Sequence, residues 1–155
     1  MVDYKDLIIR LEGTADKFEE VINGATTEAL TKRPDEKNWA PVEIICHMRD
    51  VEELFFHRFQ TMLVVDELTF HPVDVDRWAE DRQYLRNDAL EALSAFRKQR
   101  EQMLAFLKTL SPGQWERSSI HPKRGRMTIA DGVALMTNHD TNHLQQLNTA
   151  LGLKS

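Results

Sequence analysis

Apolar residues recur at helical spacing in four long segments of the chain, and this pattern predicts four helices. In the first segment, intervals of three and four residues place the apolar positions on one face of a helix that ends near Asn23 and Gly24. These positions are Tyr4, Leu7, Leu11, Ala15, Phe18 and Ile22. A second helix is expected over about residues 41 to 64, because Pro41 suits a first helical turn and an apolar stripe follows it. The stripe consists of Ile44, Met48, Val51, Phe55, Phe59 and Met62.

The third helix is expected to begin after Asn87 or Asp88, either of which can cap it, and to end before Ser111-Pro112-Gly113. Its apolar stripe consists of Ala89, Leu93, Phe96, Met103, Leu107 and Leu110. The fourth helix is expected over about residues 129 to 150, since Thr128 and Asp131 form a pattern close to a capping box. Its inner face carries Ile129, Val133, Met136, Leu147 and Leu151.

Three connections separate these helices. Residues 25–39 contain a proline and have weak periodicity, so we expect a connection with one short turn of helix. Residues 65–87 are too many for a tight loop and indicate a crossover or lid that forms a pocket wall. Residues 114–125 are expected to be irregular. Since no segment alternates with period two over a convincing length, the predicted fold class is all-α, a four-helix bundle with a long crossover between helices two and three.

Composition narrows the functional classes. The length of 155 residues fits a single domain, 1–155. A net charge of -5 argues against a nucleic-acid binder, because phosphate binding requires a clustered surplus of Lys and Arg. No window approaches the roughly 18 apolar residues of a membrane span. Cys46 is the only cysteine and the first residues do not resemble a signal peptide, so we expect no intrachain disulfide and a cytoplasmic location.

The histidines offer candidate chemistry. His139 and His143 lie one turn apart on the fourth predicted helix and beside its apolar stripe, so both imidazoles can reach one ion. A catalytic metal site commonly takes three protein ligands, and His47, near the inner face of helix two, is the best candidate for the third. Spacing alone is weak evidence, because a pair like this can arise by chance. Asp140 follows the first histidine of the pair, so the H-E-x-x-H motif of metalloproteases is absent.

The remaining histidines do not fit the same site. His57 lies ten residues after His47, about 15 Å along a helix, and cannot share an ion with it. His71 and His121 each precede a proline in presumed loops, so we expect both at the surface, with a position over the mouth of the bundle as the alternative for either. Cys46 is adjacent to His47 but lies about 100° around the helix, which favours a small buried apolar residue over a ligand.

Three stretches of the sequence resemble the DinB-like superfamily of metal-binding four-helix bundles. They are 39-WAPVEIICHMRDVE-52, 121-HPKRGRMTIADGV-133 and 139-HDTNHLQQL-147. The resemblance covers about residues 39 to 150 and implies that His47, His139 and His143 bind a divalent metal, with Gln146 at the family's glutamine position. Characterised relatives include transferases of low-molecular-weight thiols, a thiol-dependent isomerase and proteins described as metal-dependent hydrolases. Such a resemblance supports an inference about the fold and the metal site more strongly than one about the substrate.

These observations lead to a mechanistic expectation. A Zn²⁺ or Ni²⁺ ion suits three imidazoles, and an open position could bind a thiolate or a water molecule whose pKa falls towards about 7. The substrate would be a small molecule, with a low-molecular-weight thiol as a candidate cosubstrate. Asp50, Glu43 and Asp140 lie within a turn of the ligands and could accept hydrogen bonds from the free ring nitrogens, or lie at the surface.

Other side chains near the predicted site have open roles. Arg100, on the inner stripe of helix three, could meet an anionic substrate group, pair with a carboxylate or extend to solvent. The candidate catalytic residues are therefore Asp50, Asp140 and Arg100. Trp39 and Trp78 could line the pocket or belong to the core.

Two alternatives to an enzyme stay open. In the first, the protein is not a catalyst: the ion only clamps helices two and four, or the bundle serves as a dimeric, stress-related binding module. The expected assembly is a homodimer. A metal-free bundle with polar core histidines is the other. Three ligands with exchangeable water would favour catalysis, whereas a fourth protein ligand would favour a structural site.

Overall fold

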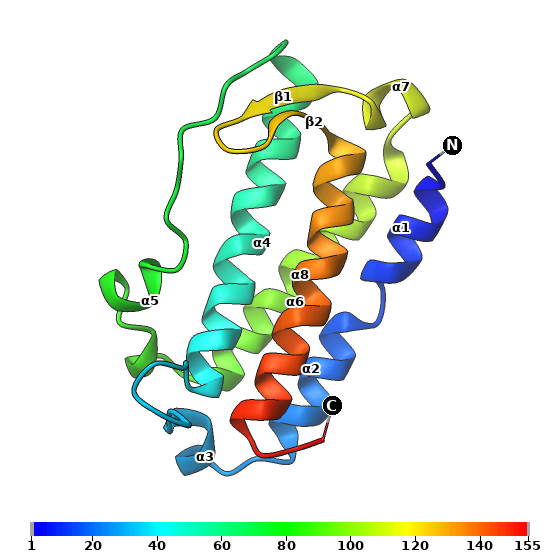
Figure 1. The fold of residues 1–155 in the computed structure, drawn as a ribbon. Helices are drawn as coiled ribbons and strands as arrows, with labels where there is room; N and C mark the ends of the chain where they lie inside the picture. Colours follow the sequence, from blue (N-terminus) through cyan, green and yellow to red (C-terminus); the bar gives the residue numbers. More distant parts are fainter. Residues whose placement is uncertain (1, 155) are drawn as a thin grey trace.

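Four long helical segments form a bundle, as predicted (Figure 1). The computed structural model describes residues 2–154. The first segment is α1 (Tyr4–Leu11) followed by α2 (Thr14–Asn23), and the other three are α4 (Pro41–Val64), α6 (Ala89–Thr109) and α8 (Ile129–Ala150). The prediction of an all-α four-helix bundle is confirmed. The last three helices occupy the segments expected from the apolar stripes, with Asp88 capping α6 and Thr128 capping α8.

Two neighbouring helices of the bundle run parallel. Figure 1 shows α4 and α6 running in the same direction, with α1, α2 and α8 running the opposite way. The α4 helix packs against α6 and α8, and α1 and α2 pack against the same two helices. Because α4 and α6 are parallel, the segment between them returns along the outside of the bundle and includes α5 (Trp78–Asp81) and the 3-10 helix η1 (Tyr84–Arg86). The predicted crossover is confirmed.

The segment predicted to be irregular before α8 contains a β-hairpin. Strands β1 (Ser118–His121) and β2 (Gly125–Thr128) pair antiparallel, with Ser118 opposite Thr128 and His121 opposite Gly125. The crossover joins the hairpin through a parallel bridge between Thr69 and Ile120. The expectation of no strand was wrong because four-residue strands are too short to show a clear alternation. Short helices α3 (Thr27–Thr31) and α7 (Pro112–Trp115) complete the fold.

The first predicted helix is broken. Residues 12 and 13 separate α1 from α2, and Gly13 has a φ of 80°, a left-handed conformation that glycine adopts readily. The break leaves the Leu11 carbonyl free to accept a hydrogen bond from Arg100 Nη1 at 3.1 Å, and lets the Thr14 hydroxyl donate to Asp140 Oδ2 at 2.9 Å. The apolar stripe stays in phase across the break, so periodicity alone predicted one continuous helix.

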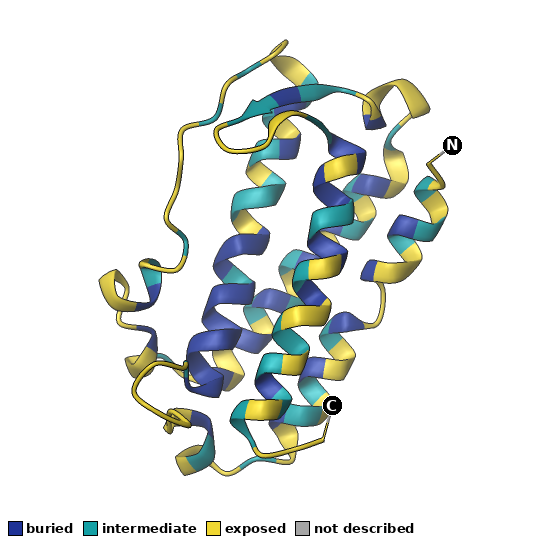
Figure 2. Ribbon diagram, viewed as in Figure 1, coloured by how far each residue is buried: buried dark blue, intermediate teal, exposed yellow. Residues whose placement is uncertain are grey.

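The core consists of two apolar clusters separated by a buried charged layer. One cluster lies around the start of α4 and includes Phe18, Ile44 and Phe96, and the other lies around its end and includes Phe59. Between them lie the buried side chains of Glu52, Arg100, Thr14 and Asp140. Figure 2 shows that the buried faces of the long helices point towards the bundle interior. Within residues 2–154, no helix is long and apolar enough to cross a membrane.

The close approach of α8 to α4 depends on Gly132. A Cβ atom added there would lie 2.6 Å from Cε1 of Phe59, whose ring is 2% exposed and cannot easily move. We expect Gly132→Ala to lower the free energy of unfolding, because overpacking costs about 1–3 kcal/mol and the better helix propensity of alanine returns at most about 1 kcal/mol. Denaturant unfolding measures the change.

Two further variants test this explanation. Gly113→Ala is the control, since the nearest atom to its added Cβ is Ser111 Oγ at 4.0 Å. Adding Phe59→Leu to Gly132→Ala should cost less than the sum of the two single changes. A strictly additive double variant would contradict the assigned clash.

Candidate metal centre

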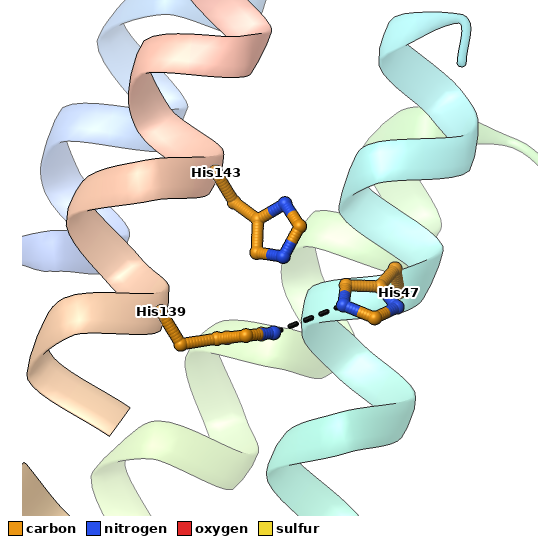
Figure 3. Close-up of side chains that lie close together, drawn as sticks. All are labelled: His47, His139 and His143. Carbon is orange, nitrogen blue, oxygen red and sulfur yellow. Dashed lines mark hydrogen bonds between the residues drawn. The ribbon is translucent and has the colours of Figure 1, made fainter. Parts of the chain in front are cut away.

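Three imidazoles from two helices meet inside the bundle. Figure 3 shows His47 of α4 facing His139 and His143 of α8. One potential ligand atom from each lies within 4.8 Å of the other two, and Nε2 of His47 is 2.9 Å from Nε2 of His139. Two nitrogens each about 2.1 Å from one ion and at right angles would be about 3.0 Å apart. The separation therefore matches two ligands of a single ion.

The helices bring these rings together for simple reasons. His139 and His143 are four residues apart and share one face of α8, which packs against α4. His47 lies on the buried face at the start of α4 and is 2% exposed. Within residues 2–154, no other His, Cys, Asp or Glu side chains form a cluster of three at ligand distances.

Burial keeps the three rings neutral. Desolvation, followed by repulsion from His143, lowers the pKa of His47 to about 3. Desolvation and the two neighbouring histidines lower the pKa of His139 to about 2. Desolvation also lowers the pKa of His143, although Gln146 and nearby carboxylates oppose the shift. Neutral imidazole is the form that binds metal ions, so the environment prepares all three side chains as ligands.

Hydrogen bonds orient the rings unequally. The Nδ1 of His143 lies 2.7 Å from Oε1 of Gln146, an oxygen that can only accept, so Nδ1 carries the proton and Nε2 keeps its lone pair. The Nδ1 of His47 is buried without a hydrogen-bond partner among the described residues. A buried polar atom of this kind is uncommon in a purely structural core and is consistent with a functional site. Gln146 therefore fixes the tautomer of one candidate ligand.

The carboxylates named from the sequence bind arginine instead of the ring nitrogens. Glu43 accepts two hydrogen bonds from Arg33, at 2.7 and 2.8 Å, and one from the Ala40 backbone N–H. Asp50 accepts hydrogen bonds from Arg49, Arg82 and Tyr84. Burial raises the pKa of Asp50, but these partners more than offset it and hold the pKa below its usual range. Both expectations for Glu43 and Asp50, a bond to a ring nitrogen or a surface position, were wrong.

Arg100 lies in the charged layer and not in solvent. It is 2% exposed, and its guanidinium donates to both oxygens of Glu52 at 2.7 and 2.8 Å and to both oxygens of Asp140 at 2.7 and 2.9 Å. Burial alone would lower the pKa of Arg100, but the two carboxylates raise it above its usual value. Of the roles left open for Arg100, pairing with a carboxylate is confirmed and extension to solvent is wrong. A surface position for Asp140 is wrong as well. Glu52, four residues after Met48 on the inner face, was the missed partner.

Two cavities reach the histidines from outside. A cleft of about 500 Å³ ends at His139, and a second cavity of about 370 Å³ ends at His143 beside Trp39 and Gln146. Asp76, in the crossover, lines both. The prediction that the crossover forms a pocket wall is confirmed, but Asp76 was not recognised because it is one of several acidic residues in that segment.

The remaining candidate side chains fall into clear positions. The Trp39 ring centroid lies 5.0 Å from that of His47 and 6.5 Å from that of His143, so Trp39 covers the site. Trp78 packs beside the core under the Arg82 guanidinium. Cys46 is fully buried, and desolvation raises its pKa to about 11, which keeps the thiol protonated and unreactive.

The three histidines outside the cluster comprise one cleft residue and two surface residues. His121 is half-buried and lines the cleft, contrary to the expected surface position, because the hairpin folds it inward. His57 and His71 are exposed.

Comparison with known proteins agrees with this geometry. The chain is 22% identical over 155 residues to "Putative metal-dependent hydrolase OB0413" of Oceanobacillus iheyensis, covering 99% of this chain and 88% of the relative. It is 21% identical over 138 residues to "Putative metal-dependent hydrolase YfiT" of Bacillus subtilis, covering 88% and 78%.

The solved structure of Bacillus subtilis YfiT superposes with a TM-score of 0.89 at 20% sequence identity, covering 99% of this chain and 92% of that one. That protein is described as "a probable metal-dependent hydrolase with an unusual four-helix bundle topology", and the likeness shows that this chain has the same fold. The family model of the DinB superfamily matches residues 10–147. The chain therefore belongs to the DinB superfamily.

Proposed function

We propose that this protein is a divalent-metal-dependent hydrolase of small molecules, with His47, His139 and His143 as the metal ligands. The observation that carries the proposal is the meeting of three neutral imidazoles, of which His139 lines one open cavity and His143 lines another. The names of the relatives support hydrolysis as the reaction class. Zn²⁺ and Ni²⁺ are among the ions that imidazole ligands suit, and we propose one of these two.

The ligand set supports catalysis more than a structural clamp. A structural zinc site is closed by four protein ligands, whereas a catalytic one has three and leaves a position open. Among residues 2–154, only the three histidines form such a cluster, and both cavities give small molecules access to it. When bound, the metal would polarise a substrate oxygen and lower the pKa of water.

The protein's own side chains then have separate tasks. Gln146 holds His143 with Nε2 free, and the Trp39 ring covers His47 and His143 on one side. Asp76 is the carboxylate that lines both cavities, and its oxygens accept the proton of the attacking water. The charged layer beneath, centred on Arg100, holds α8 against α4 and so keeps the histidines in position.

A thiol-linked transfer reaction is the second candidate. The observation that favours it is the pair of cavities, since molecules of two kinds could approach the histidines from His139 and from His143. A low-molecular-weight thiol would then be the cosubstrate. The homodimer and the cytoplasmic location stay predictions.

Metal content and a substrate panel test the proposal together. Elemental analysis of the purified protein should find close to one Zn²⁺ or Ni²⁺ per chain. The loaded and chelator-treated proteins are then given aryl esters and amides, with and without an added thiol. Metal-dependent release without thiol supports the hydrolase, and release only with thiol supports the transferase. Protein without metal contradicts the proposal, and a loaded protein that is inactive throughout favours the non-catalytic module.

Gln146→Leu should weaken metal binding about 10- to 100-fold, because partners that orient a ligating histidine commonly carry this much affinity. Gln146→Glu should retain most of the affinity, since a carboxylate also accepts from Nδ1. Competition with a coloured chelator measures both. Gln145→Leu is the matched control, because Gln145 is exposed and makes no hydrogen bond to a ligand among the described contacts. Equal losses at positions 145 and 146 would contradict the assigned role.

Asp76→Asn should lower turnover by about 10²-fold or more while metal content stays near one per chain, because the amide cannot accept a proton. Asp81→Asn is the control, an exposed carboxylate of α5 that lines neither cavity. Turnover and metal content are measured on the same preparations. Unchanged turnover in Asp76→Asn would contradict the proposal that this carboxylate accepts the proton.

A further inference from the structure

Arg58 of α4 is a half-buried cation without a counter-charge. Among residues 2–154, five arginines are buried or half-buried, and four of them have a carboxylate oxygen within 4.0 Å. These four are Arg49, Arg97, Arg100 and Arg117. The described contacts of Arg58 are a 3.3 Å hydrogen bond from Nη2 to the His71 carbonyl and a position 4.9 Å above the Phe70 ring. Neither contact neutralises its charge.

An uncompensated guanidinium is costly to bury. Desolvation lowers the pKa of Arg58, yet arginine remains charged at any ordinary pH. The His71 carbonyl and the Phe70 ring would be sufficient partners for an uncharged hydrogen-bond donor. The positive charge of the guanidinium is stabilised most by an anion. Because Arg58 lines the cleft that ends at His139, a molecule bound in that cleft can supply the anion.

The hairpin adds more positive charge to the same cleft. The backbone N–H groups of Lys123 and Arg124 both donate to Nδ1 of His121 at 3.1 Å, which fixes the turn and leaves the ring proton on Nε2. His121, Lys123 and Arg124 all line the cleft. Neither Lys123 nor Arg124 has a carboxylate within 4.0 Å in the described part of the chain. Positive charge therefore gathers at one end of the cleft although the chain carries a net charge of -5.

An apolar surface connects these cations to the histidines. On one face of α4, His47 is followed by Val51, Phe55 and Arg58, at steps of four, four and three residues. Eleven residues of helix separate His47 from Arg58 by about 16 Å along the axis. Val51 and Phe55 line the cleft between them. The crossover contributes Asp74 and Asp76 to the cleft, and their charge repels an anion from that wall.

We infer that the cleft takes a small molecule with an anionic group, carboxylate or phosphate, which binds Arg58, Lys123 and Arg124 while an apolar segment leads from it to a bond beside His139. The position of the reacting bond rests on the proposed function. The anion site does not, since it is formed by cations that are separate from the three histidines.

Titrations with three ligands of equal chain length test the inference. Hexanoate, hexyl phosphate and neutral hexanamide are added to the ¹⁵N-labelled protein, both as purified and after chelator treatment, and backbone amide shifts are followed by NMR. We expect at least one anion to shift residues 54–58 and 121–124, and hexanamide to bind about tenfold more weakly or worse. The two anions decide between carboxylate and phosphate.

Variants locate the anion site. Arg58→Met should weaken anion binding about tenfold or more, Arg58→Lys less, and Arg124→Gln should weaken it at an exposed position that does not threaten the fold. Arg86→Met is the matched control, since Arg86 is exposed and lies outside the cleft lining. Thermal unfolding of each variant checks its folding.

The outcomes separate this inference from the proposed function. Binding that survives metal removal but fails in Arg58→Met and Arg124→Gln supports the inference, even if the protein proves to have no hydrolase activity. Binding that is lost with the metal and is unchanged in both variants places the anion on the ion, which overturns the inference and leaves the hydrolase proposal intact. Equal binding of hexanamide and the anions also overturns it.

Discussion

Arg100→Met is expected to lower the free energy of unfolding by about 3–5 kcal/mol, the usual cost of removing one member of a buried ion-pair group. The substitution keeps much of the side-chain volume but leaves Glu52 and Asp140 buried without their cation, at 3% and 4% exposure. It also leaves the Leu11 carbonyl without its 3.1 Å hydrogen bond. Denaturant unfolding, followed by far-UV circular dichroism, measures the loss.

A matched arginine on the same helix serves as the control. Arg97 lies within one turn of Arg100 and contacts Asp16 and Glu19, but its side chain is 31% exposed and both carboxylates lie at the surface. Exposed ion pairs contribute about 0–1 kcal/mol, so Arg97→Met should change little. Replacing Arg100, Glu52 and Asp140 together by Met, Met and Leu should recover most of the stability, because no charge then stays buried. Similar losses in Arg100→Met and Arg97→Met would contradict the role assigned to the buried layer.

His139→Ala is expected to reduce metal affinity at least about a hundredfold, since binding energies of about 10–16 kcal/mol over four zinc ligands correspond to roughly 3 kcal/mol for each. His139 is the natural choice because its Nε2 lies 2.9 Å from that of His47 and its ring ends the large cleft. Elemental analysis after dialysis, together with chelator competition, measures the change. Activity should fall with metal content.

His57→Ala is the control for this variant. His57 is on α4 like His47, but it is exposed and outside the cluster, so its removal should leave both metal content and affinity unchanged. Addition of Zn²⁺ should raise the unfolding midpoint of the native protein and of His57→Ala, but not of His139→Ala, because a ligand that binds only the folded state stabilises it. If His139→Ala retained full metal content, the ion would have to bind elsewhere.

The helices could be predicted because each carries its own signals. In α4 and α8, a proline or a capping residue precedes an apolar stripe, and both signals act within a few residues of each other. The break at Gly13 could not be found in this way, because its cause is tertiary: at the opened turn the Leu11 carbonyl accepts a hydrogen bond from Arg100, and the Thr14 hydroxyl donates one to Asp140. The hairpin was missed since its short strands depend on pairing with each other and with the crossover.

The candidate ligands could be chosen from the sequence because helix faces and a three-ligand rule limit the options. The residues that surround these ligands could not be predicted from the sequence. Asp50 and Glu43 have the right chemistry to orient an imidazole, but arginines that are distant or unremarkable in the sequence take both carboxylates. Asp76 and Arg58 line one cleft only because the crossover and the hairpin fold over one side of α4, which no local pattern reveals.

The parallel arrangement of α4 and α6 has a consequence for the order of folding. Parallel neighbours cannot form a helical hairpin, so α6 can dock on α4 only after the crossover has spanned the bundle, at a cost in chain entropy. His47 and His139, separated by 92 residues, then meet only when α8, the last of the four long segments in chain order, has docked. Metal capture is therefore expected to be a late event, and it would report that all four helical segments have docked.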